Sequence, residues 1–181
     1  MRRLLFLAVV ALFTVQPAHA ETVKINLHSC CVTEDATTKE ILPAFKKYYK
    51  EKFGKDVDIS ASFAGSGTLK NQILGGAPVQ VAVLSSELYL DQLKEKGPIS
   101  SDWRKNPNKG AVSELIKFLY TADAQRSYAK FGFRPVDKKV EKEFHAKYAQ
   151  VAEPFTVDDL GGWKSARKNV IENVWKKTQQ R

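Results

Sequence analysis

A short run of small polar residues, Gly65-Ser66-Gly67-Thr68, lies between a predicted strand and a predicted helix. Glycines allow a backbone to approach a ligand closely, and a helix start carries unpaired N–H groups with a partial positive charge. Together with the hydroxyl groups of Ser66 and Thr68, such a loop could bind a tetrahedral oxyanion without a lysine. A plain tight turn with a serine cap has the same pattern, because short glycine motifs are weak signals.

Two further strand ends carry small polar side chains. Ser29-Cys30 ends the first predicted strand, and Ser85-Ser86 follows the third. In open α/β sheets, ligands bind beyond the carboxyl ends of the strands. We therefore expect an anion at Gly65–Thr68 to have Ser29 or Cys30, and also Ser85, nearby. Three such ends on one rim indicate a binding site more strongly than any one of them does.

Catalytic and metal-binding constellations are not evident in the sequence. It shows no Ser/His/Asp spacing, no convincing carboxylate pair and no Walker-type glycine loop, so we predict no catalytic residues, no metal and no cofactor. Cys30 and Cys31 are adjacent and lack the two-residue spacer that redox pairs usually have. A thiol enzyme that uses either cysteine remains the least favoured of our hypotheses.

The elements that would hold this rim follow from the hydrophobic pattern. Strands are predicted at Val23–Ser29, Val57–Phe63 and Val79–Leu84. Each is followed by a predicted helix, at residues 35–52, 68–74 and 86–96, and Thr33 or Asp35 could cap the first. This alternation predicts an α/β fold with a short parallel sheet and right-handed crossovers.

Beyond Gly110 the pattern predicts helices alone, at residues 112–131, 137–151 and 163–178. We expect this helical segment to pack on the thin sheet, because the first helix carries apolar residues that need burial. They are Leu115, Ile116, Leu119 and Tyr120. The segment is also rich in lysine and arginine, which could form a nucleic-acid face, but solvated helix surfaces are the ordinary explanation. We expect no nucleic-acid partner.

Residues 1–20 have the pattern of a cleavable signal peptide. A basic start precedes the apolar run Leu4–Val15, and Ala18-His19-Ala20 provides the small residues that signal peptidase requires. A membrane anchor would need about 20 apolar residues. We therefore expect export to the periplasm and a mature chain that starts near Glu21. The 181 residues, 43% hydrophobic and 27% charged with a net charge of +9, have an ordinary globular composition.

Several stretches resemble the periplasmic sulfate/thiosulfate-type substrate-binding proteins of ABC transporters. They are Asp58–Leu74, Val79–Leu93, Asp102-Trp103 with Lys105-Asn106-Pro107, Phe118–Asp137 and Phe155–Lys164. The resemblance implies the type II periplasmic-binding-protein fold, an inorganic oxyanion such as sulfate or thiosulfate as ligand, and the membrane permease of an ABC importer as partner. It also implies that Ser66 donates to the bound anion.

The chain departs from this family in one large respect. Family members hold the anion between two lobes, whereas Gly110 here leads directly into Ala111–Leu119, which looks like sequence from after the second lobe. We therefore expect a signal peptide at 1–20, an α/β first lobe at 21–110, a helical segment at 111–181, and no second lobe. This chain would be a shortened receptor. The alternative is an exported scaffold remnant or partner-binding protein with little or no ligand affinity.

Overall fold

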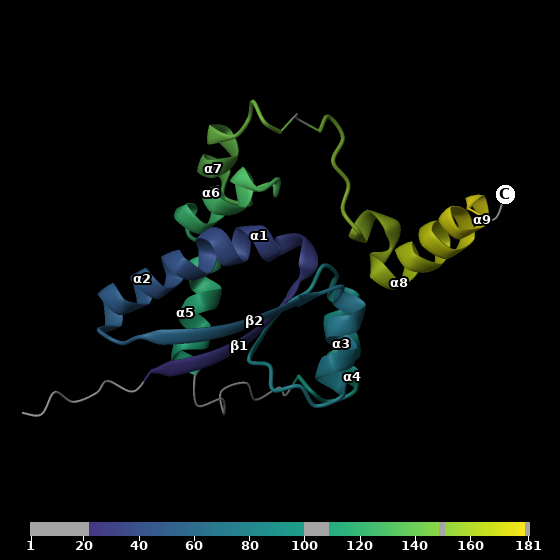
Figure 1. Cartoon of the computed structure of the whole chain (residues 1–181). Helices are drawn as coiled ribbons and strands as arrows, with labels where there is room; N and C mark the ends of the chain where they lie inside the picture. The colour runs from purple at the N-terminus through teal and green to yellow at the C-terminus, as the bar shows by residue number, and fades with distance from the viewer. Residues whose placement is uncertain (1–21, 100–108, 149–150, 180–181) are drawn as a thin grey trace, which may run out of the picture.

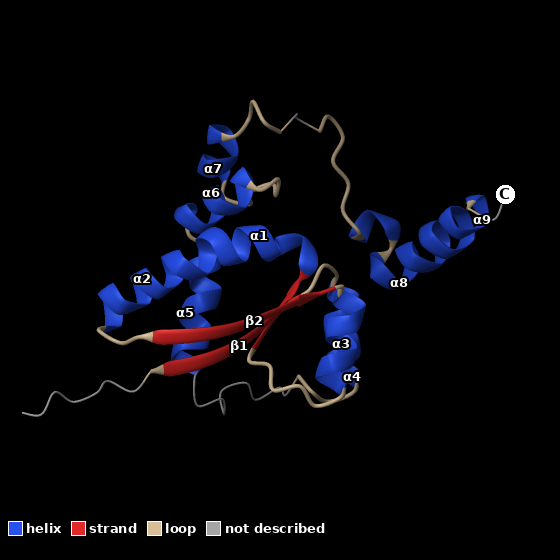
Figure 2. Ribbon diagram, viewed as in Figure 1, coloured by secondary structure: helices blue, strands red, loops and turns tan. Residues whose placement is uncertain are grey.

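The structure, a computed structural model, describes residues 22–99, 109–148 and 151–179. The predicted leader and the segment that contains Trp103 lie outside the described residues. Strands β1 (Val23–Cys30), β2 (Val57–Ala64) and β3 (Val81–Val83) form a parallel sheet in the order β2-β1-β3 (Figures 1 and 2). The predicted α/β class and the parallel sheet are confirmed.

Strand β3 is shorter than predicted. Its residues pair only with the stretch Leu27–Ser29 of β1. Just before this stretch, the backbone N–H of Asn26 donates to the side-chain oxygen of Gln80 at 2.6 Å, and the backbone N–H of Gln80 donates to the Asn26 carbonyl at 3.0 Å. A side chain therefore takes the place of one backbone partner, and the regular ladder begins only at Val81.

The helices of the first half follow the strands as predicted. They are α1 (Glu34–Ala36), a π-helical segment at Thr37–Ile41, α2 (Leu42–Phe53), α3 (Ser66–Leu74) and α4 (Glu87–Glu95). Gly54 ends α2 with a positive φ of 67°, a conformation that glycine adopts without strain. Neither Thr33 nor Asp35 caps the first helix, because the Thr33 hydroxyl donates instead to the Cys30 carbonyl at 2.8 Å.

The predicted single helix at 112–131 is wrong, since the structure has two helices there. Helix α5 (Lys109–Leu119) is followed by α6 (Ala122–Lys130). Between them Thr121 is extended; its hydroxyl donates to the Phe118 carbonyl at 2.7 Å and accepts from the N–H of Ala124 at 3.4 Å. One threonine thus interacts with the end of the first helix and the start of the second.

The predicted helix at 137–151 is also shorter in the structure. Helix α7 spans Lys138–Glu143, and Asp137 caps it by accepting from the N–H groups of Lys139 and Val140. The end of the predicted helix, residues 149–150, lies outside the described residues.

The last helices are continuous with one another and lie away from the sheet (Figure 1). They are α8 (Gly162–Ala166), a π-helical segment at Arg167–Trp175 and α9 (Lys176–Thr178). Helix α8 contacts α4, so the helix predicted at 163–178 is present but does not cover the strands. Within the part of the chain that the structure describes, none of the helices could cross a membrane.

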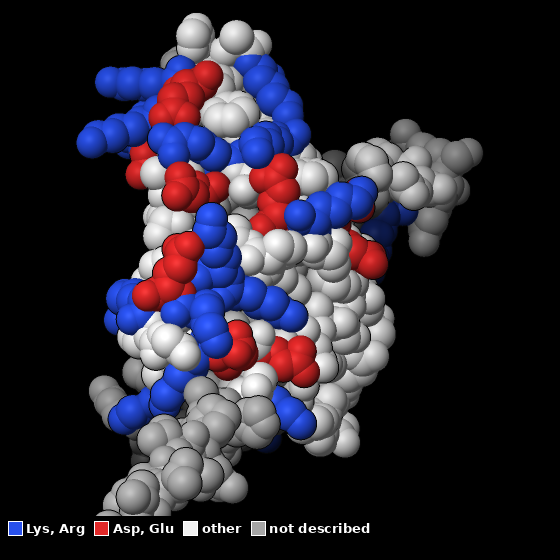
Figure 3. All heavy atoms as spheres, turned by 60° about the vertical axis from the view of Figure 1, so that its left-hand side comes forward, with Lys and Arg blue, Asp and Glu red and all other residues white. Residues whose placement is uncertain are grey.

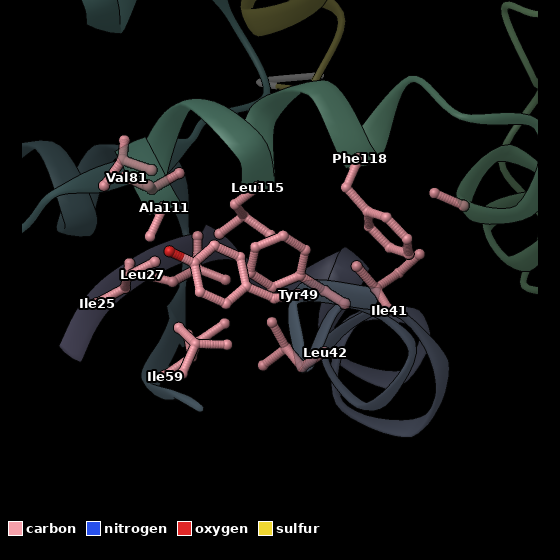
Figure 4. Packing of buried hydrophobic residues seen from close by; sticks show 14 residues of the cluster. Ile25, Leu27, Ile41, Leu42, Tyr49, Ile59, Val81, Ala111, Leu115 and Phe118 are labelled. Carbon is pink, nitrogen blue, oxygen red and sulfur yellow. The ribbon is translucent and has the colours of Figure 1, made fainter. Parts of the chain in front are cut away.

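Helix α5 packs on the core face of the sheet, against β1 and α2 (Figure 4). Leu115 is 1% exposed, but Ile116 is 46% and Tyr120 is 68% exposed, so the predicted apolar stripe is only partly buried. The face that is buried consists of Ala111, Val112, Leu115 and Phe118. It meets Ile25 and Leu27 of β1, which lie in the same cluster.

One ionic network joins α2 to α5. A Glu114 oxygen lies 2.9 Å from Lys52 Nζ, the other lies 2.9 Å from Lys117 Nζ, and the Tyr48 hydroxyl donates to the carboxylate at 3.0 Å. Hydrogen bonds from Lys52 and then Lys117 lower the pKa of the Glu114 carboxyl to about 2. The Glu114 side chain is 13% exposed, so water screens it less than it does the other surface carboxylates.

Replacing Glu114 with glutamine should lower the free energy of unfolding by about 1 kcal/mol at pH 7. The folded-state pKa lies below the ordinary value of 4.5, so this stabilisation is present above pH 4.5 and is lost as the pH falls toward 2. Urea denaturation of both proteins at pH 7 and pH 3 should show the difference shrinking. Glu51→Gln, which removes a loose 3.9 Å pair, is the control and should have little effect at either pH.

Candidate functional site

Three loops at the carboxyl ends of the strands bring polar side chains together. Ser66, the first residue of α3, is buried, and its Oγ lies 3.0 Å from the Oγ of Ser85, which follows β3. The backbone N–H of Ser85 also donates to Ser66 Oγ at 3.0 Å. The hydroxyl of Ser66 therefore joins the start of α3 to the loop before α4, as expected for neighbouring strand ends.

The thiol of Cys30 completes this group from the end of β1. Hydrogen bonding to the Ser66 side chain is the main cause that lowers the pKa of the Cys30 thiol, although burial acts in the opposite direction. The backbone of Val32 and the side chains of Cys31 and Ser85 lower it further. Cys30 is buried and Cys31 is exposed, and the two are free thiols.

Ser29 lies on the opposite face of β1 and does not join this group. Side chains alternate along a strand, so Ser29 shares the core face with Leu27. Ser29 is 1% exposed, and its hydroxyl lies 2.7 Å from Thr33 Oγ1. Of the two expected neighbours from the first strand, the structure brings Cys30 and not Ser29 to Ser66.

The start of α3 leaves backbone donors available beside these side chains. Gly65 precedes the helix in an extended conformation, and its carbonyl accepts from the N–H of Leu69 at 3.0 Å. By helix geometry, the N–H groups of Ser66, Gly67 and Thr68 come before the first intrahelical hydrogen bond. Thr68 itself is exposed.

Open space surrounds this helix start. A Cβ atom built at Gly65 would meet nothing within 4 Å, and one at Gly67 would meet the Tyr89 hydroxyl at 3.8 Å. The glycines are therefore not required by crowding within the protein. Tyr89, in the first turn of α4, was not among the predicted site residues; its only signal in the sequence is its position soon after Ser86, which caps that helix.

The rim offers a thiol, two hydroxyls and helix-start N–H groups, which are hydrogen-bond donors suited to an anion. A metal site is not formed: among residues 22–99, 109–148 and 151–179, no group of three or more His, Cys, Asp and Glu side chains could hold a metal ion.

Comparisons with known proteins bear on this rim. The family model described as "bacterial extracellular solute-binding protein" matches residues 32–111, which include α3 and its glycine-rich start. The description of this model names solute-binding proteins.

The names of the curated relatives agree with the description of this family model. The "sulfate-binding protein" of Synechococcus elongatus is 30% identical over 104 residues, which cover 57% of this chain and 29% of that protein. The "thiosulfate-binding protein" of Pseudomonas aeruginosa is 32% identical over 75 residues, which cover 40% of this chain and 23% of that protein. This chain therefore spans less than a third of the length of these relatives.

A solved structure supports the fold. The sulfate-binding protein SubI from Mycobacterium tuberculosis H37Rv matches with a TM-score of 0.68 at 15% identity, covering 82% of this chain and 99% of that one. At this identity the match shows that the two chains share an architecture. Over residues 32–111 the chain is thus similar to the bacterial extracellular solute-binding proteins, and its predicted resemblance to the sulfate- and thiosulfate-binding proteins is confirmed.

Proposed function

We propose that this protein is a shortened periplasmic receptor that binds a sulfate- or thiosulfate-like oxyanion for an ABC importer. The observation that carries the proposal is the convergence of Cys30, Ser66 and Ser85 at the start of α3. The anion would lie against Gly65–Thr68 and accept hydrogen bonds from helix-start N–H groups and from these side chains. Ser29 would support Thr33 beneath the site rather than contact the ligand.

The protonation state of the Cys30 thiol affects the binding of an anion. A protonated Cys30 can donate a hydrogen bond to an anion, whereas a thiolate would repel it. Hydrogen bonding to Ser66 lowers the pKa of this thiol, so the thiolate forms at a lower pH than in an unperturbed cysteine.

Export and partners complete the proposal. The leader at 1–20 would direct the chain to the periplasm and be removed near Glu21, and the membrane permease of the importer would be the partner. The match to an extracellular solute-binding family supports an extracytoplasmic location. The boundaries of the first lobe at 21–110 and of the helical segment at 111–181 are part of the same proposal.

Sulfate titration of the exported protein, with its N-terminus identified by mass spectrometry, tests this function. A single lobe leaves the site open to water, where each hydrogen bond contributes only about 0.5–1.5 kcal/mol. We therefore expect a dissociation constant of roughly 1 mM by calorimetry at constant ionic strength. Ser66→Ala should weaken binding about tenfold by removing the hydroxyl that links both loops.

The matched control is Ser60→Ala, which removes an exposed hydroxyl from the middle of β2, well before the rim. It should bind sulfate as the unaltered protein does. If sulfate and thiosulfate produce no saturable heat, or if both variants bind equally, the receptor function is excluded. The alternative of an exported scaffold with little or no ligand affinity then takes its place.

A further inference from the structure

The C-terminal helix from Gly162 to Thr178 carries an apolar surface that other described residues leave open. Val170 and Ile171 are each 44% exposed, Val174 is 56% and Trp175 is 61% exposed. These four residues lie in the π-helical segment, in which hydrogen bonds join residues five apart. Residues spaced by four and five therefore share a side, and the four form one patch, called the apolar patch below.

The helix that carries this patch is rich in basic residues. The helix contains one acidic residue, Glu172, which pairs with Arg167 at 3.2 Å, against five basic residues. The basic residues are Lys164, Arg167, Lys168, Lys176 and Lys177.

Charged side chains are arranged differently on the rest of the protein. On the face shown in Figure 3, basic and acidic side chains are interspersed. Ion pairs such as Lys52–Glu114 and Arg126–Glu143 bind many of them. The charge of the C-terminal helix is thus not balanced in the way that the charge of the body is.

Acidic residues of α4 lie opposite the basic residues at the start of the C-terminal helix, but not opposite Lys176 and Lys177 at its end. The charged residues of these two helices that line a hollow between them are acidic on α4 and mostly basic on the C-terminal helix. They are Glu87, Asp91 and Glu95 from α4, and Lys164, Arg167, Lys168 and Glu172 from the C-terminal helix. Opposite charges therefore face each other where the helix meets the body. None of the four residues of the apolar patch lines this hollow, and neither does Lys176 or Lys177.

We propose that the apolar patch and the lysines beside it bind the surface of an anionic lipid bilayer, with the helix lying along that surface. Exposed aliphatic residues, a tryptophan and flanking lysines are the features of helices that bind at the lipid–water interface. Lysines near an anionic surface add an attraction that salt weakens.

A second copy of this chain is a poorer occupant. A stable dimer buries about 800 Å² on each partner, more than four side chains provide. Two such helices would also bring like charges together, whereas anionic headgroups would neutralise them. Charge and patch size therefore both favour lipid.

Vesicle co-sedimentation of the exported chain tests this proposal. We expect binding to vesicles of phosphatidylcholine with about 30% phosphatidylglycerol, weak binding to pure phosphatidylcholine, and release in high salt. Trp175→Ala should lower the partition coefficient about tenfold, because the indole is the largest apolar group in the patch. The double change Lys176→Gln with Lys177→Gln should lower it by a similar factor.

Two controls change the same chemistry elsewhere on the surface. Tyr120→Ala removes an aromatic side chain that is 68% exposed just after α5, and Lys46→Gln with Lys47→Gln removes two exposed lysines from α2. Both should bind vesicles normally. The proposal is overturned if the controls weaken binding as much as the helix variants do, if binding ignores lipid charge, or if light scattering shows a dimer that Trp175→Ala dissociates.

Discussion

Replacing Leu115 with alanine is expected to lower the free energy of unfolding by about 3 kcal/mol. Leu115 is 1% exposed and lies where α5 meets Ile25 and Leu27 of β1 (Figure 4). Deleting a buried isobutyl group costs its transfer from water and also the cavity that remains, because the packed neighbours relax only partly. Urea denaturation followed by circular dichroism measures the loss.

The neighbouring residue provides the control. Ile116→Ala removes a side chain of the same size that is 46% exposed, so its cost should be well under that of Leu115→Ala. The two residues share one helix and differ in the face on which they lie. Equal losses, or a larger loss at Ile116, would contradict the packing of α5 on the sheet and favour the stripe expected from the sequence.

The sequence could not choose between these two faces of α5. Apolar residues occur on both sides of this helix, so local periodicity allows more than one buried stripe. The choice depends on partners far away in the chain, because Phe118 packs against Phe45 with ring centroids 5.5 Å apart. This contact determines which face of α5 is buried, and it leaves Tyr120 exposed.

The strand–helix alternation of the first half could be predicted, because it depends on local pattern. The three strands lie where the pattern placed them, although β3 is shorter. The length of β3 could not be predicted, because it depends on the long-range pairing of Gln80 with Asn26. The break between the two helices at Thr121 could not be predicted either, because a threonine inside a periodic run of apolar residues is compatible with a continuous helix.

Part of the candidate site could also be predicted from the sequence, and part of it could not. That Ser66 and Ser85 would approach each other followed from the rule for strand ends in α/β sheets. The choice between Ser29 and Cys30 could have been made from the sequence, because alternation places Ser29 with the apolar residues Ile25 and Leu27. The position of Tyr89 against Gly67 could not, because it depends on how α4 packs on α3.

The packing beneath α3 should control both stability and the candidate site. Leu69 of α3 and Leu93 of α4 are each 0% exposed and lie outside the cluster that α5 covers. Leu69→Ala should lower the free energy of unfolding by about 3 kcal/mol. It should also loosen the start of α3, because the buried Leu69 side chain holds in place the first turn, in which the backbone N–H of Leu69 donates to the Gly65 carbonyl at 3.0 Å.

The thiol of Cys30 reports that second effect. Moving Ser66 away removes the main cause that lowers the pKa of this thiol, so the pKa should rise toward its ordinary value. Alkylation of Cys30 measured against pH, in a protein where Cys31 is serine, should therefore show a higher midpoint after Leu69→Ala. The exposed Gln72 is the control: Gln72→Ala should change neither the midpoint nor the stability substantially.

An unchanged midpoint in a destabilised Leu69→Ala protein would mean that Ser66 stays in place without the Leu69 side chain. That outcome would show that the packing of Leu69 and the hydrogen bonds of Ser66 are independent of each other. The expected result joins them: the same buried leucine that stabilises α3 also keeps Ser66 within reach of Cys30 and Ser85. The geometry of the rim then depends on a side chain that no ligand could touch.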